Sequence, residues 1–189
     1  GEVRLMAESL QGNGLITLEK RGKGQLFGWV SLLRGQPCET IQASTDCQTV
    51  YIPSEVFVRL VKLDNNFGKF FNNLSNIHEA WNVISSVLEK EPKPPKDIDL
   101  AIKTYCSKTI ALTVKNITES NTKDLNFYLS TPSCENKQVG SLIGNEEKVI
   151  PPKGFIIPIR AIGLPKNIFT SNIEIPKYEK ANIDNTVIA

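Results

Sequence analysis

The chain has 189 residues, of which 40% are hydrophobic and 22% are charged, and its formal net charge is only +2. This composition is typical of a globular protein with one or two small domains, and it provides no basic face for nucleic acid. No apolar run approaches the roughly 20 residues that cross a bilayer, and no secretory signal is present, so we expect a cytoplasmic protein. The four cysteines are widely spaced, which favours reduced thiols over a zinc site.

Two strands are predicted within residues 1–24. Val3–Ala7 alternates loosely between apolar and polar residues, and Leu15–Leu18 follows a polar turn. Gly22 and Gly24 close the second strand. The Gly-Lys-Gly sequence that they frame lacks the strand, loop and helix of a phosphate-binding loop, so we interpret it as an ordinary turn.

The stretch Gln25–Thr45 has the sequence QLFGWVSLLRGQPCETIQAST, in which a short apolar helical turn lies between two glycines and a proline precedes a strand. Gly28 permits a sharp turn or a close approach to a ligand, because it has no Cβ. Free N–H groups at the start of the helical turn can hold an anion. On local physics alone, a surface loop between two strands explains the pattern equally well.

Residues 39–52 predict two more strands around a turn at Thr45-Asp46, because Thr, Val, Ile and Tyr dominate this stretch. Three helices should follow, with Ser54 as the cap of the first and Ser75 or Asn76 as the cap of the third. Their expected apolar faces follow helical spacing. These faces comprise Phe57, Leu60 and Val61; Phe67, Phe70, Phe71 and Leu74; and Ile77, Trp81, Ile84 and Leu88.

The only histidine, His78, falls on the third helix, where we expect an ordinary surface residue without a catalytic role. Glu91–Lys96 contains three prolines and predicts a linker. From about Asp97 the pattern predicts strands, and the polar tail from about Lys166 is expected to be extended or poorly ordered. The later strands are expected at Ile110–Val114, Leu125–Leu129 and Gly154–Ile162, with turns at 116–123, 131–136 and 151–154.

The segment Phe27–Thr40, FGWVSLLRGQPCET, resembles the phosphate-binding cassette of the cyclic nucleotide-binding domain. That cassette usually consists of Phe-Gly-Glu, a small residue, two apolar residues, Pro-Arg and two small residues. The resemblance needs no gap and continues through Ala43–Cys47 and Ile52–Phe57 to Leu60. It covers about residues 1–75 and implies a β-roll that begins at the family's third strand, without the first helix and two opening strands.

Two positions that bind a nucleotide in that family differ here. Trp29 replaces the glutamate that binds the ribose 2′-hydroxyl, and Cys38 replaces the arginine that pairs with the cyclic phosphate. A thiol has neither the planar fork nor the fixed charge of a guanidinium, and Glu39 adds a negative charge that repels a phosphate. Arg34 lies in the same loop, but a solvated loop charge is its simplest interpretation. The candidate ligand-binding residues of this degenerate cassette are Phe27, Gly28, Trp29, Val30, Ser31, Leu32, Arg34, Cys38, Glu39 and Thr40.

The form FGW-SLL-G-PCE-QAST is similar to the version found in the N-terminal region of bacterial peptide-exporting ABC transporters that carry a leader-cleaving cysteine peptidase domain. In those proteins helices and a β-rich linker follow the roll, and Asn126–Ser130 and Pro158–Pro165 resemble that linker. The resemblance implies two partners, the rest of a membrane transporter and its peptide substrate. It also implies association with the membrane through the full-length protein.

We therefore expect an α+β chain, mostly β, in four parts. Residues 1–75 form a partial jelly-roll-like β-roll, 76–96 a helix and proline linker, 97–165 a β-rich segment, and 166–189 a polar tail. Unpaired strand edges in the roll are expected to favour a homodimer.

The sequence predicts no catalytic chemistry. One histidine on a helix surface makes no credible Ser/His/Asp or Cys/His pair, and no Walker A, metal-ligand or helix-turn-helix pattern occurs. We expect a non-catalytic regulatory or interaction module without a metal or cofactor. The alternative is a genuine sensor for a cyclic nucleotide or another anion, in which Trp29 stacks on a base.

Overall fold

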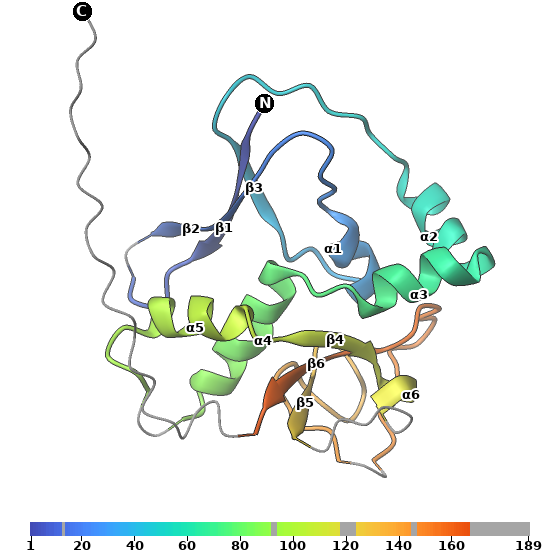
Figure 1. Ribbon diagram of the computed structural model, residues 1–189. Helices are drawn as coiled ribbons and strands as arrows, with labels where there is room; N and C mark the ends of the chain where they lie inside the picture. The colour runs from blue at the N-terminus through green and yellow to red at the C-terminus, as the bar shows by residue number, and fades with distance from the viewer. Residues whose placement is uncertain (13, 92–93, 118–123, 145–146, 167–189) are drawn as a thin grey trace, which may run out of the picture.

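The computed structural model describes residues 1–12, 14–91, 94–117, 124–144 and 147–166 (Figure 1). Helices account for 32% of the described residues and strands for 21%, so the fold is α+β, as expected, but a mostly-β chain is not confirmed. The elements in chain order are β1 (Val3–Glu8), β2 (Leu15–Arg21), α1 (Trp29–Arg34), β3 (Thr40–Ala43), α2 (Ser54–Leu63), α3 (Asn65–Asn73), α4 (Ile77–Leu88), α5 (Ile98–Cys106), β4 (Ile110–Thr113), α6 (Val114–Ile117), β5 (Leu125–Leu129) and β6 (Arg160–Pro165).

The first sheet has three antiparallel strands in the order β2-β1-β3, and its central strand is β1. Both strands predicted before residue 24 are confirmed, and a register shift between Leu5 and Met6 interrupts the β1–β2 pairing. Of the two strands predicted within residues 39–52, only β3 is present, and residues 46–52 pair with no strand in the described part of the chain. A sheet of this size does not confirm a jelly roll.

Helices α2, α3 and α4 are the three helices predicted after the first sheet. Asn76 caps α4 as predicted, because its Oδ1 accepts hydrogen bonds from the N–H groups of His78 and Glu79 at 2.9 and 3.4 Å. Ser54 does not cap α2; it is the first helical residue and follows Pro53. The buried faces are narrower than predicted, since the Leu60 and Phe70 side chains are exposed while Phe57, Val61 and Phe71 are buried.

The second sheet is also antiparallel, in the order β4-β6-β5. The predicted strand at Leu125–Leu129 is confirmed as β5, but the strand predicted at Gly154–Ile162 begins only at Arg160, as β6. The expectation of strands from Asp97 onward is wrong, because α5 comes first. Asp97 caps that helix by accepting from the N–H of Leu100 at 3.0 Å.

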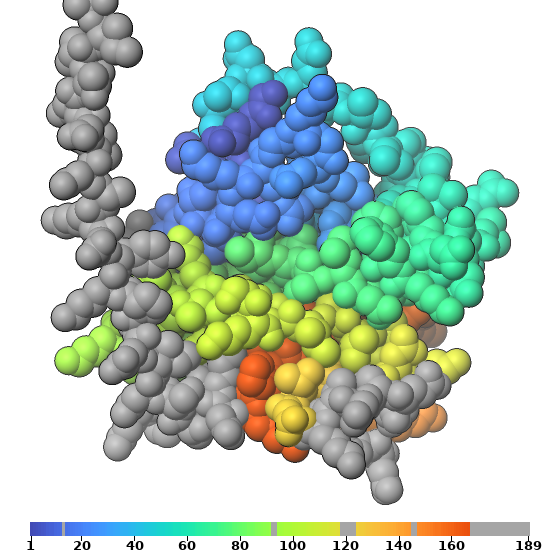
Figure 2. Space-filling model, in the orientation of Figure 1, coloured from blue at the N-terminus to red at the C-terminus, as the bar shows by residue number. Residues whose placement is uncertain are grey.

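Helices α4 and α5 lie between the two sheets (Figures 1 and 2). Their buried side chains form one core with β4 and β6, and Ala7, Ile16 and Leu18 of the first sheet pack against it. The first sheet and the second sheet are therefore joined by packing as well as by the expected linker, of which residues 92–93 lie outside the described residues. The polar tail expected after Lys166 also lies outside them.

None of the helices that the structure describes combines the length and apolar character needed to cross a bilayer.

Candidate functional site

The cassette forms one short helix, α1, bounded by two glycines. Gly28 precedes α1 with φ of 82° and Gly35 ends it with φ of 76°. Both angles lie in the left-handed region, which glycine adopts without strain. Gly35 is also crowded, because an added Cβ would lie 2.6 Å from the ring of Phe155. The two turns predicted from the sequence are therefore present. Between them, α1 buries the side chains of Trp29, Val30, Leu33 and Arg34.

Trp29 is a core residue. Its side chain is 4% exposed and packs edge-on against Phe71, with ring centroids 5.2 Å apart. The guanidinium of Arg160 lies 5.7 Å from the centroid of the Trp29 ring. The aromatic and apolar residues of α1, α2 and α3 form one cluster around it: Trp29, Val30, Leu33, Phe57, Val61 and Phe71, with Leu32 and Cys38 partly buried against them. The indole is thus placed where it contacts protein on several sides.

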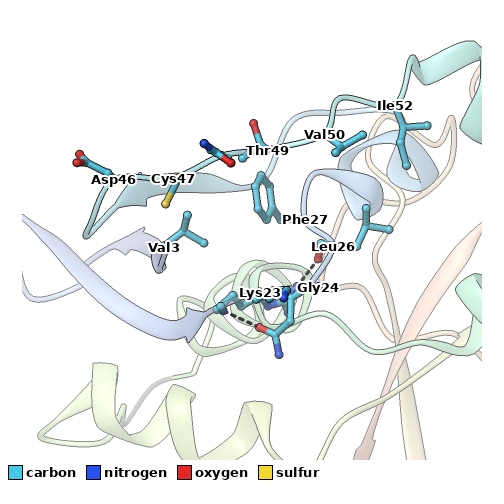
Figure 3. A pocket seen from close by; sticks show the side chains of 15 residues that line it. Val3, Lys23, Gly24, Leu26, Phe27, Asp46, Cys47, Thr49, Val50 and Ile52 are labelled. Atoms are coloured by element: carbon cyan, nitrogen blue, oxygen red, sulfur yellow. Dashed lines mark hydrogen bonds between the residues drawn. The ribbon is translucent and has the colours of Figure 1, made fainter.

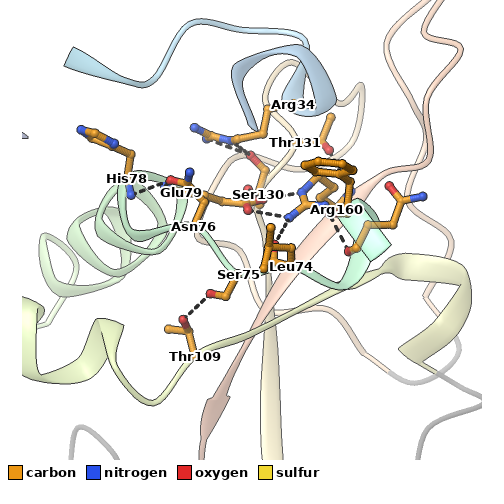
Figure 4. A network of polar contacts seen from close by, with 12 residues as sticks. Arg34, Leu74, Ser75, Asn76, His78, Glu79, Thr109, Ser130, Thr131 and Arg160 are labelled. Carbon is orange, nitrogen blue, oxygen red and sulfur yellow. Dashed lines mark hydrogen bonds and ion pairs between the residues drawn. The ribbon is translucent and has the colours of Figure 1, made fainter. Parts of the chain in front are cut away.

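Arg34 is buried, so its interpretation as a solvated loop charge is wrong. Its Nε and Nη2 donate to the carbonyl oxygen of Ser130 at 3.0 and 2.9 Å, and Nη2 also donates to Oδ1 of Asn82 at 2.8 Å (Figure 4). Ser130 directly follows β5. The side chain of Arg34 therefore ties the cassette to α4 and to the C-terminal sheet, where it satisfies a buried carbonyl.

Ser31, Cys38 and Glu39 meet beside α1. The hydroxyl of Ser31 accepts from the Cys38 N–H at 3.2 Å and donates to Oε2 of Glu39 at 3.4 Å. Nδ2 of Asn76 donates to Oε1 of Glu39 at 3.2 Å, and the Glu39 side chain is only 2% exposed. Burial raises the pKa of the Cys38 thiol, although Arg34 opposes the shift. The cassette thus encloses a carboxylate of the chain itself.

His78 is buried, which corrects the prediction of a helix-surface residue. Its Nε2 lies 2.8 Å from the carbonyl oxygen of Met6, because this side of α4 rests on β1. Its Nδ1 makes no hydrogen bond within the described residues and lies 4.0 Å from Oε1 of Glu39. Burial lowers the pKa of His78, while the Met6 carbonyl and Glu39 act in the opposite direction.

Sequence reasoning missed a buried ion pair between Glu79 and Arg160. Nε and Nη2 of Arg160 donate to the two carboxylate oxygens of Glu79, each at 2.8 Å, and both side chains are 0% exposed. The hydroxyl of Ser130 donates to Oε1 of Glu79 at 2.7 Å. The remaining donors of Arg160 bind the carbonyl oxygens of Phe71, Asn72 and Leu74, each at 3.1 Å. The pair thereby connects β6, α4 and the end of α3.

A cavity of about 700 Å³ lies beside the first residue of the cassette, between residues 21–27 and 46–52 (Figure 3). Phe27 is the only cassette candidate that lines it, and Gly1 and Val3 belong to its lining as well. The other predicted site residues lie elsewhere: Thr40 is exposed at the start of β3, and the remaining eight lie in α1 or next to it. The structure therefore brings Ser31, Cys38 and Glu39 together but places the cavity apart from them.

Within the described residues, no group of three or more His, Cys, Asp or Glu side chains is placed to hold a metal ion. Comparisons with protein-family models, curated proteins and solved structures find no match to this chain.

Proposed function

We propose that this chain is a non-catalytic regulatory or interaction module of a bacterial peptide-exporting ABC transporter, and that its cyclic-nucleotide cassette has lost ligand binding. The sequence resemblance motivates the assignment to this class. On this proposal the module acts on the cytoplasmic side, its partners are the rest of the transporter and the exported peptide, and it associates with the membrane through the full-length protein.

The observation that carries the proposal is the buried carboxylate of Glu39. Ser31 and Asn76 hold it through hydrogen bonds inside the cassette, and the neighbouring position is a neutral thiol, Cys38. A phosphate brought to this place would meet a negative charge in a region of low dielectric, where repulsion is strong. It would also lack the guanidinium that pairs with phosphate in the resembling family.

The two other distinctive cassette side chains support an interaction role. Trp29 packs near Arg160, and Arg34 binds the carbonyl of Ser130, so both connect α1 with the C-terminal half of the chain. A partner bound to either half could thus act on the other through these contacts, without any ligand in the cassette.

Isothermal titration calorimetry with cyclic AMP and cyclic GMP tests the proposal. We expect no binding tighter than about 10 µM, which corresponds to roughly −7 kcal/mol. A double variant, Cys38→Arg with Glu39→Ala, is the matched control, because it restores a positive charge and removes the buried negative one. Tight binding by the unaltered chain would overturn the proposal.

A second candidate, a sensor for a cyclic nucleotide or another anion, is favoured by the cavity at Phe27, since Lys23 lines its wall. Native mass spectrometry of the purified chain distinguishes the two. A small anion that remains bound through purification would favour the sensor.

A further inference from the structure

The single histidine of the chain, His78, has its tautomer fixed by a neighbouring strand. His78 lies in the first turn of α4 (Figure 4), and its Nε2 is 2.8 Å from the carbonyl oxygen of Met6 in β1. A carbonyl oxygen can only accept a hydrogen bond, so Nε2 carries a hydrogen. In the neutral ring Nδ1 therefore carries none and is itself an acceptor.

The acceptor Nδ1 lies next to a second acceptor, the carboxylate of Glu39. The distance from Nδ1 to Oε1 of Glu39 is 4.0 Å, and both side chains are only 2% exposed. Nδ1 has no hydrogen-bond partner among the described residues. Buried polar atoms are nearly always paired, so two acceptors side by side are an unfavourable arrangement. One proton on Nδ1 would convert it into a charge-assisted hydrogen bond.

Glu39 is held at present by two long hydrogen bonds. The Ser31 hydroxyl donates to its Oε2 at 3.4 Å, and Nδ2 of Asn76 donates to its Oε1 at 3.2 Å. Strong hydrogen bonds between a charged nitrogen donor and a carboxylate are shorter, at about 2.7–2.9 Å. The carboxylate would therefore gain a stronger contact by moving toward a protonated His78.

Two charged side chains act on His78 with opposite signs. Glu39, directly before β3, favours the imidazolium, whereas Arg21, the last residue of β2, opposes it. Burial lowers the pKa of His78, and the backbone of Met6 and of Thr40 acts in the same direction as Glu39. Because burial is the largest effect, the ring is neutral at pH 7 and takes up a proton only in acid.

The other titratable groups beside the pair are already committed. Glu79, the next residue of α4, accepts from Arg160 with both carboxylate oxygens at 2.8 Å. Burial raises the pKa of the Cys38 thiol, which therefore stays neutral. Glu39 is thus the carboxylate that a proton on His78 engages.

We propose that His78 and Glu39 form a proton-operated switch that couples the first sheet to the cassette. In acid, Nδ1 of His78 takes up a proton from solvent, the Glu39 carboxylate closes on the imidazolium, and the hydrogen bond between Ser31 and Glu39 opens. The Ser31 hydroxyl also accepts from the N–H of Cys38 at 3.2 Å, so the change reaches the segment between α1 and β3. The two positions of Glu39 are discrete, as a switch requires.

This inference goes beyond the proposed function and does not rest on it. Nucleotide binding measured at neutral pH involves the neutral ring, so its result leaves the switch untouched. Failure of the switch likewise leaves the buried charge of Glu39 inside the cassette. The two proposals can therefore fail separately.

Nitrogen-15 NMR of the imidazole tests the switch in the unaltered chain, and the single histidine needs no assignment. At about pH 7.5 we expect the tautomer with its hydrogen on Nε2, and one protonation step below the ordinary pKa of about 6.5. The amide signals of Ser31 and Cys38 should shift with the same midpoint as the ring. A hydrogen on Nδ1 at neutral pH, or amide signals that do not follow the ring, overturns the proposal.

Glu39→Gln removes the charge that attracts the proton. It should lower the pKa of His78 by about one unit or more and abolish the accompanying shift of the Ser31 amide. Glu55→Gln is the matched control, because Glu55 is exposed in the first turn of α2, and it should leave the midpoint unchanged.

Circular dichroism follows the fold through the same titration. Equal midpoints in Glu39→Gln and the unaltered chain contradict the proposal, as does proton uptake that occurs only when the chain unfolds. The amide titration of the unaltered chain decides the matter if Glu39→Gln does not fold.

Discussion

The guanidinium of Arg160 and the carboxylate of Glu79 form a two-pronged ion pair, with both N···O distances at 2.8 Å and both side chains closed to solvent. They are 81 residues apart in the sequence. Every N–H group of Arg160 is used, since three backbone carbonyls at the end of α3 accept the others. The pair therefore holds α4 and the end of α3 against β6. It can stabilise the fold because each buried N–H group of the Arg160 guanidinium has an acceptor.

Removal of one charge from the Glu79–Arg160 pair should lower the free energy of unfolding substantially. In Glu79→Gln, Arg160 keeps its buried charge without a counter-charge, and breaking a buried pair typically destabilises a protein by about 3–5 kcal/mol. Urea denaturation should show this loss in the free energy of unfolding. The exposed pair Glu2–Lys20, with N···O at 3.1 Å, is the matched control, and Glu2→Gln should cost less than about 1 kcal/mol. Equal losses in both variants would contradict the structural role.

The contribution of Arg34 to stability should depend on the shape of its guanidinium as well as on its charge. Arg34→Lys keeps the charge but cannot donate through two nitrogens to the carbonyl of Ser130, and a poorly satisfied buried polar group costs about 1–3 kcal/mol. Arg59 is exposed on α2, so Arg59→Lys should change stability by no more than about 0.5 kcal/mol. Thermal unfolding of the two variants compares them. A stable Arg34→Lys variant would restore the interpretation of Arg34 as a solvated residue.

Local signals in the sequence predicted the elements that depend on local physics. The Asn76 cap and the strands β1, β2 and β5 are present, because a capping side chain and alternating β-branched residues act over a few residues. The α5 helix lies where strands were predicted, although its buried residues, Ala101, Ile102, Tyr105 and Cys106, follow helical spacing.

The candidate site was less predictable, because its side chains are paired over long sequence distances. Arg34 contacts Ser130 at a separation of 96 residues, and His78 contacts Met6 at 72. A single sequence does not reveal which charged residue faces the interior when the partner is so remote. Residues 46–52 show the opposite situation. Their sequence favours a strand, but their backbone pairs with no strand in the described part of the chain.

His78 should make stability depend on pH. Its pKa is lowered by burial, so the unfolded state binds a proton at higher pH than the folded state does. Stability is then complete above the ordinary value of about 6.5 and is lost as pH falls from there toward the folded pKa. We expect the free energy of unfolding to fall between pH 7.5 and 5.5 in the unaltered chain, and to fall less in His78→Gln. Urea denaturation at several pH values measures both slopes, and parallel curves would refute the assignment.

The cysteines should differ sharply in reactivity toward iodoacetamide at pH 8. The thiolate is the reactive form, and burial raises the pKa of Cys106 to about 12 and also raises the pKa of Cys38 and Cys134. Cys47 is only half-buried and lines the cavity between residues 21–27 and 46–52, so it should be alkylated first.

Mass spectrometry of timed samples gives the order, and Cys47→Ser should remove the fast phase without changing the slow ones. All four cysteines should react together in urea, because unfolding removes the burial that raises these pKa values. Rapid alkylation of Cys106 in the native chain would contradict its burial between α4 and α5.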